Sequence, residues 1–86
     1  MELVFSDSAG REMEDLEQEL QSLFIKHFEK MKMKSHRKHL KYGIPCHVEK
    51  VTKQARIVYH VKGDLIYVLH LFASHKEYER WYKSYK

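Results

Sequence analysis

The chain has 86 residues, 43% of them hydrophobic, and this predicts one folded domain with a modest core over residues 1–86. The formal net charge is +4, and no apolar run approaches the length of a membrane-spanning helix. Length, composition and charge therefore exclude a disordered chain and a membrane anchor.

The charge is divided unevenly along the sequence. Residues 1–25 carry a net charge of −6, and residues 26–86 carry a net charge of +10. Residues 26–41 are dense in Lys and Arg, which can neutralise the phosphates of a nucleic acid. Such bases also occur on ordinary solvated surfaces, so the pattern leaves both a polyanion partner and a mixed-charge surface open.

The cysteine and histidine residues indicate the cellular compartment and whether a metal is expected. The lone Cys46 excludes an internal disulfide and fits a reducing cytoplasm. The first residues carry acids where a secretory signal would carry Lys or Arg, so we expect no signal peptide and a cytoplasmic location. His36 and His39 are spaced like a metal pair, but no Cys or carboxylate nearby completes a ligand set. We expect neither a metal nor another cofactor.

The first half of the chain is predicted to form a strand followed by helical structure. Residues 2–5 form a short apolar strand, and Ser6 or Ser8 can cap the helix that follows. From residue 9 to about residue 34 the apolar residues recur at intervals of three and four, as in a helix. A single helix of that length would be too long for so small a domain, so we predict a break near Glu17 and Gln18.

The second half predicts three strands. In residues 46–51 apolar and polar residues alternate, which predicts a short strand. Residues 56–61 and 65–72 are rich in β-forming residues and are joined by a Gly-centred turn at residues 62–64. With a two-residue turn, the strict alternation of a strand places His70 on the same face as Ile57 and opposite to the face of Arg56. A three-residue turn would reverse the faces of the second strand.

A final helix is predicted after the third strand. Ser74 and Glu77 fit a capping box, in which the Ser74 side chain accepts a hydrogen bond from the backbone N–H of Glu77. The aromatic residues after the cap lie on one helical face, and we expect Trp81 to be the main core anchor among them.

This order of elements resembles the RelE/ParE superfamily of toxins from type II toxin–antitoxin systems. Arg56-Ile57-Val58-Tyr59 looks like the R-[LIV]-V-Y strand of that family, and residues 74–78 look like its terminal basic segment. The resemblance implies an α+β fold in the order β-α-α-β-β-β-α, with an antiparallel sheet packed against an N-terminal helical pair and a short C-terminal helix.

The resemblance also implies a function. Members of the RelE/YoeB-like branch are toxins that cleave mRNA on the ribosome and so inhibit translation, and their partners are a cognate antitoxin, the ribosome and mRNA. Arg56 occupies the position of a phosphate-contacting arginine, and His75 and Lys76 occupy the terminal basic positions. His47 and Glu49 stand where RelE itself carries two lysines, which is a departure from that pattern.

Metal-independent RNA cleavage needs a base for the 2′-OH, an acid for the leaving 5′-oxygen and a cation for the charged phosphorane. We expect Glu49 to act as the general base, His75 as the general acid, Arg56 as the clamp on the transition state, and His47 as a supporting base or as a group that orients the others. These four residues should converge if the turn at residues 52–54 pairs the two flanking strands. RNA or ribosome contacts are predicted for Lys50, Lys53, Lys76, Tyr78, Tyr82, Lys30, Lys34, Arg37 and Lys38.

Two other functions remain open on the sequence. A ParE-like toxin shares the fold and poisons DNA gyrase without catalysis, and a basic RNA-binding domain would have neither catalysis nor a toxin role. The candidate acid–base residues favour the nuclease, because a protein that only binds does not need them.

Overall fold

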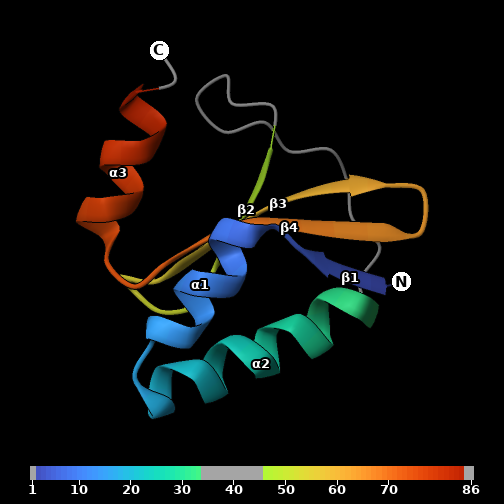
Figure 1. The fold of residues 1–86 in the computed structure, drawn as a ribbon, viewed down its shortest axis with the longest axis horizontal. Coiled ribbons are helices and arrows are strands. Elements are labelled where there is room, and N and C mark those ends of the chain that lie inside the picture. The colour runs from blue at the N-terminus through green and yellow to red at the C-terminus, as the bar shows by residue number, and fades with distance from the viewer. Residues whose placement is uncertain (1, 34–45, 85–86) are drawn as a thin grey trace.

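The computed structural model describes residues 2–33 and 46–84 (Figure 1). The predicted α+β class and the predicted order of elements are confirmed in these residues. The elements are β1 (Glu2–Phe5), α1 (Asp7–Asp15), α2 (Gln18–Met33), β2 (His47–Lys50), β3 (Arg56–Lys62), β4 (Leu65–Phe72) and α3 (His75–Ser84).

The four strands form one mixed sheet in the order β1-β4-β3-β2. Strands β2, β3 and β4 are antiparallel to their neighbours, but β1 runs parallel to β4, with Glu2 opposite Leu65 and Phe5 opposite Val68. The prediction of an antiparallel sheet is therefore wrong for β1. Parallel neighbours need a long crossover, and here α1, α2 and the first two antiparallel strands provide it.

The helices lie on both faces of the sheet (Figure 1). The helical pair α1 and α2 packs on one face, where Phe24, Phe28 and Met31 of α2 meet Ile57, Tyr59, Ile66 and Val68 of the sheet. Helix α3 covers part of the other face, where Tyr78 packs with Val58, Phe72 and Cys46. The domain thus has two small apolar layers separated by the sheet.

Local signals account for most of the element boundaries. The predicted break between the two helices is confirmed, because α1 ends at Asp15 and α2 begins at Gln18. Ser6 caps α1 by accepting from the Ala9 N–H at 3.0 Å. Ser74 accepts from the Glu77 N–H at 3.2 Å and so caps α3. Gly63 has a φ of +59° in the β3–β4 turn, a conformation that suits glycine.

A bulge in β4 changes the predicted faces of that strand. Val58 lies opposite His70 and Tyr59 lies opposite Val68, so Leu69 is an extra residue with no partner of its own. His70 therefore shares the face of Val58, and its predicted place beside Ile57 is wrong. Strict alternation cannot anticipate a bulge, because the extra residue reverses the parity of every residue after it.

The anchor of α3 also differs from the prediction. Tyr78 is 1% exposed, whereas Trp81 is only half-buried. The Trp81 ring packs at the rim, 5.6 Å from the His70 ring and 5.8 Å from the Phe72 ring. Since α3 starts directly after β4, its first turn lies closest to the sheet, and this turn contributes Tyr78.

Candidate functional site

Strand β2 divides its polar side chains between the two faces of the sheet. Glu49 lies opposite Ile57, which belongs to the core beneath α1 and α2, and His47 shares that face by alternation. Lys50 lies opposite Arg56, and this pair faces α3. Because β2 is an edge strand of the described sheet, side chains from both faces are close to its outer edge.

Four side chains, His27, His47, Glu49 and Tyr59, form an acid–base cluster between β2, β3 and α2. His27 Nδ1 lies 3.2 Å from Glu49 Oε2, a hydrogen-bond distance with the proton on Nδ1. The rings of His47 and Tyr59 are stacked, with centroids 5.1 Å apart and an interplanar angle of 19°. The side chains of His27 and Glu49 are 20% and 16% exposed, so the cluster is half-shielded from water.

The tyrosine of this cluster is held in its neutral form. Burial, together with the negative charge of Glu49, raises the pKa of Tyr59 to about 12. The unfolded chain releases this proton near pH ~10 while the folded chain still retains it. Tyr59 therefore contributes stability that is present below pH ~10 and is lost as the pH rises towards the folded pKa.

Replacing Glu49 with Gln is expected to lower the pKa of Tyr59 part of the way towards its ordinary value. The shift is partial because burial, the larger cause, remains after the charge has been removed. The measurement is a spectroscopic titration of phenolate absorbance, with Tyr59→Phe identifying the contribution of this ring. An unchanged pKa in Glu49→Gln would show that the carboxylate does not act on the phenol.

Arg56 is engaged in holding the turn between β2 and β3. Its side chain is almost completely buried, and Nη1 donates to the carbonyl oxygens of Thr52 at 2.9 Å, Lys53 at 3.1 Å and Ala55 at 3.0 Å. The guanidinium carbon lies 5.8 Å from the centre of the Tyr78 ring. These contacts give Arg56 a structural role in closing the turn.

His75 lies at the first turn of α3, on the side of the sheet to which Arg56 points. Its Nδ1 is 2.8 Å from Glu79 Oε1, and its backbone N–H donates to Gln54 Oε1 at 3.3 Å. The hydrogen bond from Lys83 is the main cause that lowers the pKa of Glu79, so this carboxylate stays charged beside the imidazole.

The predicted convergence of all four catalytic candidates is wrong. His47 and Glu49 lie on the face of α2, whereas Arg56 and His75 lie on the side of α3. The cause is the register of the β2–β3 pair, which places Arg56 opposite Lys50 and not opposite Glu49. A register that differs by one residue exchanges the faces of a whole strand.

The predicted RNA contacts have different surroundings. Tyr78 is 1% exposed, so its ring is not accessible for the predicted RNA contact, while Tyr82 is half-buried. The predicted contacts Lys34, Arg37 and Lys38 lie outside the described residues. The remaining lysines are exposed and available to a polyanion: Lys30, Lys50, Lys53 and Lys76.

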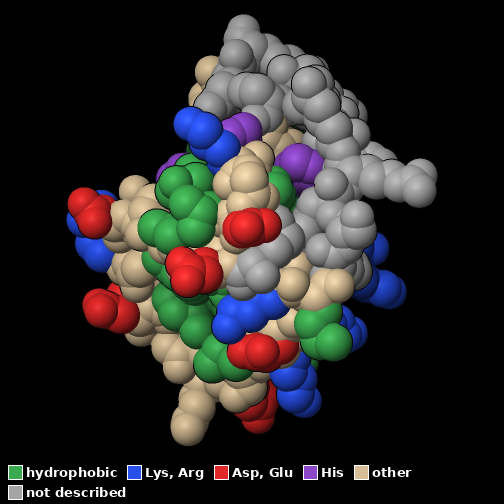
Figure 2. Space-filling model, turned by 90° about the vertical axis from the view of Figure 1, so that its right-hand side faces the viewer, with side chains coloured by type: hydrophobic (Ala, Val, Ile, Leu, Met, Phe, Trp, Pro, Cys, Tyr) green, Lys and Arg blue, Asp and Glu red, His purple; other side chains and the backbone are tan. Residues whose placement is uncertain are grey.

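One face of the molecule shows how the charged side chains are distributed (Figure 2). On the face drawn in Figure 2, acidic and basic side chains lie interspersed, with apolar side chains between them. The division of charge along the chain therefore does not appear as separated patches on this face.

Sequence reasoning missed His27, which stands in the basic segment. It lies one turn after the buried Phe24 and beside the buried Phe28, at the border of the apolar stripe of α2. A histidine at such a border is held close to the sheet, and this is the signal that could have identified it. Its partner Glu49 is 22 residues away, and this distance conceals the pair in the sequence.

Comparison with protein families and with curated proteins gives no match. Among solved structures, the fold is similar to that of a copper-bound mutant toxin from Helicobacter pylori, with a TM-score of 0.66. The similarity covers 90% of this chain and 97% of that one, at 17% sequence identity. At this identity the likeness establishes a common fold, so the chain has the fold of a bacterial toxin.

Within residues 2–33 and 46–84, no helix is long and apolar enough to cross a bilayer. No three His, Cys, Asp or Glu side chains within them are grouped so that they could hold a metal ion.

Proposed function

We propose that the chain is the toxin of a type II toxin–antitoxin system and that it cleaves mRNA during translation on the ribosome. The observation that carries this proposal is the acid–base cluster at the edge strand of a fold shared with a bacterial toxin. The cluster gathers a carboxylate, two imidazoles and a neutral phenol, which are groups suited to proton transfer at neutral pH.

The reaction uses the 2′-OH of the RNA as its nucleophile. Glu49 accepts the 2′-OH proton, and the 2′-oxygen forms a bond to the adjacent phosphorus. The bond from phosphorus to the 5′-oxygen breaks, and His47 gives a proton to this leaving oxygen. The products are a 2′,3′-cyclic phosphate and a 5′-hydroxyl, and the step consumes no oxidant, metal or water.

The neighbours of Glu49 support these roles. His27, at 3.2 Å, fixes the orientation of the carboxylate, and Tyr59 can donate from its neutral hydroxyl. His47 shares the strand face of Glu49, so the geometry supports it better than His75 as the acid that acts with this base. The exposed Lys50 and Lys53 add positive charge beside the same edge strand and attract the phosphate backbone.

The separation of Arg56 and His75 from Glu49 favours a second candidate function. A ParE-like toxin that poisons gyrase requires no acid–base site, and Arg56 is already bound to three carbonyl groups. In either function we propose a cognate antitoxin as partner and the cytoplasm as location. The roles of Arg56 and His75 in cleavage stay predictions.

The deciding experiment is primer extension on an mRNA translated in a purified system, with and without the protein and with ribosomes omitted. We expect cuts at defined codon positions only when ribosomes translate, and fragments that end in a 2′,3′-cyclic phosphate. Cleavage that is absent in every arm, combined with inhibition of gyrase supercoiling, would replace the nuclease with the gyrase inhibitor.

His47→Ala and His75→Ala, compared in the same assay, distinguish the two candidate acids. The variant that loses the larger part of its cleavage identifies the proton donor.

A further inference from the structure

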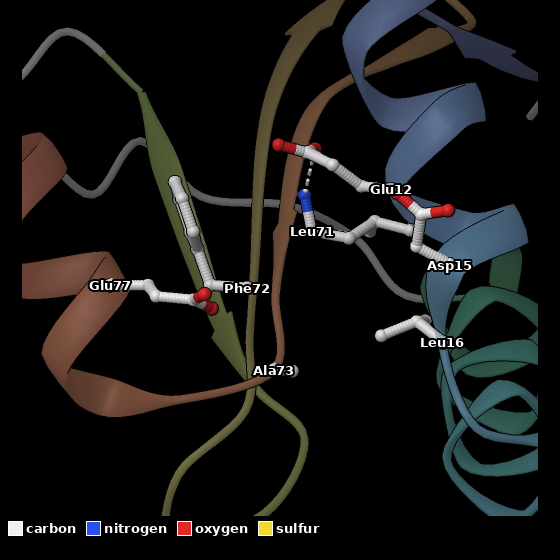
Figure 3. A pocket seen from close by; sticks show the side chains of 7 residues that line it. All are labelled: Glu12, Asp15, Leu16, Leu71, Phe72, Ala73 and Glu77. Atoms are coloured by element: carbon white, nitrogen blue, oxygen red, sulfur yellow. Dashed lines mark hydrogen bonds between the residues drawn. The ribbon is translucent and has the colours of Figure 1, made fainter.

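A groove lies at the end of β4, where residues of α1, β4 and α3 line it (Figure 3). It has a volume of about 360 Å³. Leu16, Leu71, Phe72 and Ala73 form an apolar floor, and the carboxylates of Glu12, Asp15 and Glu77 line it as well. Asp15 comes from α1 and Glu77 from α3, so the groove lies between two helices.

The groove exists because β1 is shorter than β4. Strand β1 pairs with residues 65–68 only, and α1 then runs beside the rest of this edge. Two side chains take the place of a neighbouring strand there. Ser6 Oγ donates to the Leu69 carbonyl at 2.8 Å, and Glu12 Oε1 accepts from the Leu71 N–H at 2.9 Å (Figure 3).

Beyond this point no strand among residues 2–33 and 46–84 pairs with the outer edge of β4. The N–H and C=O groups of one strand residue point to the same side, so the Leu71 C=O points outwards with its N–H, and the next outward group is the Ala73 N–H. No described residue supplies a hydrogen-bonding partner for either group. Unpaired groups at a strand edge are a template for the backbone of another chain.

The two groups match one residue of a parallel strand. In a parallel pair, a residue opposite Phe72 donates its N–H to the Leu71 C=O and accepts from the Ala73 N–H. Its side chain then points to the face of Phe72, where Glu77 begins the groove wall, and its neighbours point towards Leu16. Parallel addition also continues the direction of β1 along the same edge.

The negative charge of the groove determines which kind of peptide segment can bind there. Glu12, Asp15 and Glu77 line the groove, with no Lys or Arg among its lining residues, on a chain whose net charge is +4. Glu12 is already engaged, because its Oε1 accepts from the Leu71 N–H and its Oε2 lies 3.2 Å from His70 Nδ1. Asp15 and Glu77 therefore attract a cationic segment and repel an acidic one. The apolar floor suits alternating apolar residues.

We propose that this groove binds an extended segment of a partner protein that carries a lysine or arginine among apolar residues, and that the segment adds to β4 as a parallel strand. The backbone of the segment pairs with Leu71 and Ala73, and its cationic side chain lies near Glu77 and Asp15. This interaction is independent of RNA cleavage and requires no residue of the acid–base cluster.

The test is an NMR titration of the ¹⁵N-labelled full chain with the peptide acetyl-Val-Arg-Val-Lys-Val-amide. We expect the amide signals of residues 71–73 to shift and the Ala73 amide to become protected from exchange. The acidic peptide acetyl-Val-Glu-Val-Asp-Val-amide should not bind. Equal binding of the two peptides, or no binding of the basic peptide, would overturn the proposal.

Matched variants separate the groove from general surface charge. The double variant Asp15→Asn with Glu77→Gln should weaken binding of the basic peptide about tenfold, because two partly exposed charge pairs are lost. The double variant Glu19→Gln with Glu29→Gln removes two exposed carboxylates outside the groove and should bind normally. Equal losses in both double variants would show that only net charge matters.

A modified peptide tests the backbone pairing separately. Methylation of the arginine backbone nitrogen removes the proposed donor to the Leu71 C=O and leaves the charge intact. Loss of binding is expected, and unchanged affinity would contradict addition to the strand.

Discussion

Glu49→Gln is expected to reduce ribosome-dependent cleavage by about 10²–10⁴-fold, the usual contribution of one general acid or base. Gln keeps the size of Glu49 and can still accept from His27, but it cannot take the 2′-OH proton. Primer extension under single-turnover conditions measures the rate at one codon position, so that docking and turnover do not obscure the chemical step.

Glu29→Gln is the matched control for this variant. Glu29 is exposed on α2, where it pairs only with Lys32 at 3.7 Å among the described residues, and its loss should leave cleavage unchanged. Thermal unfolding of both variants checks that neither has lost its structure. Cleavage by Glu49→Gln within twofold of the unmodified chain would remove Glu49 from the mechanism.

The second large effect is expected from Arg56→Met, which should lower the free energy of unfolding by about 2–4 kcal/mol. Methionine retains an apolar stem beside the Tyr78 ring but removes the donor to the carbonyl groups of Thr52, Lys53 and Ala55. The Ala55 carbonyl keeps the Val51 N–H as a donor at 3.0 Å, but the Thr52 and Lys53 carbonyls lose the Arg56 donor, and the loss of a partner in a half-buried turn carries a desolvation cost. Urea unfolding gives the change in free energy.

Lys50→Met is the control, since Lys50 lies opposite Arg56 on the same strand pair but is exposed. Its substitution should change the free energy of unfolding by no more than about 0.5 kcal/mol. If Arg56→Met were as stable as the unmodified chain and yet failed to cleave, Arg56 would be a phosphate ligand and its structural role would be refuted.

The parts of the fold that were predictable rest on local chemistry. Ser6 and Ser74 cap helices because their side chains reach the backbone N–H three residues later. The break between α1 and α2 follows from the size of the domain, and the turn at Gly63 follows from the conformational freedom of glycine. Each of these features needs only a few neighbouring residues.

The parts that were not predictable rest on register. The turn between Val51 and Ala55 determines which residue of β3 lies opposite Glu49. The residue types in that turn do not predict this register. The bulge at Leu69 likewise reverses the face of His70 without a local signal. A site built from two strands therefore depends on pairing that the sequence alone leaves undetermined.

The pair of His27 and Glu49 illustrates the same limit. Both residues are visible in the sequence, but the contact between α2 and β2 that joins them is tertiary. Sequence reasoning predicted Glu49 as the general base but did not predict that His27 contacts it.

The pairing of β1 with β4 determines when, during synthesis of the chain, the folded domain can form. Ser6 bonds to Leu69, 63 residues later, and α2 buries its apolar stripe against strands from the second half of the chain. Contacts of such sequence separation slow folding, because the intervening chain must be ordered before they form. An N-terminal half that has just left the ribosome has no sheet on which to pack. The acid–base cluster therefore assembles only after β3 has been synthesised and has paired with β2, so a chain that ends before β3 has no such cluster.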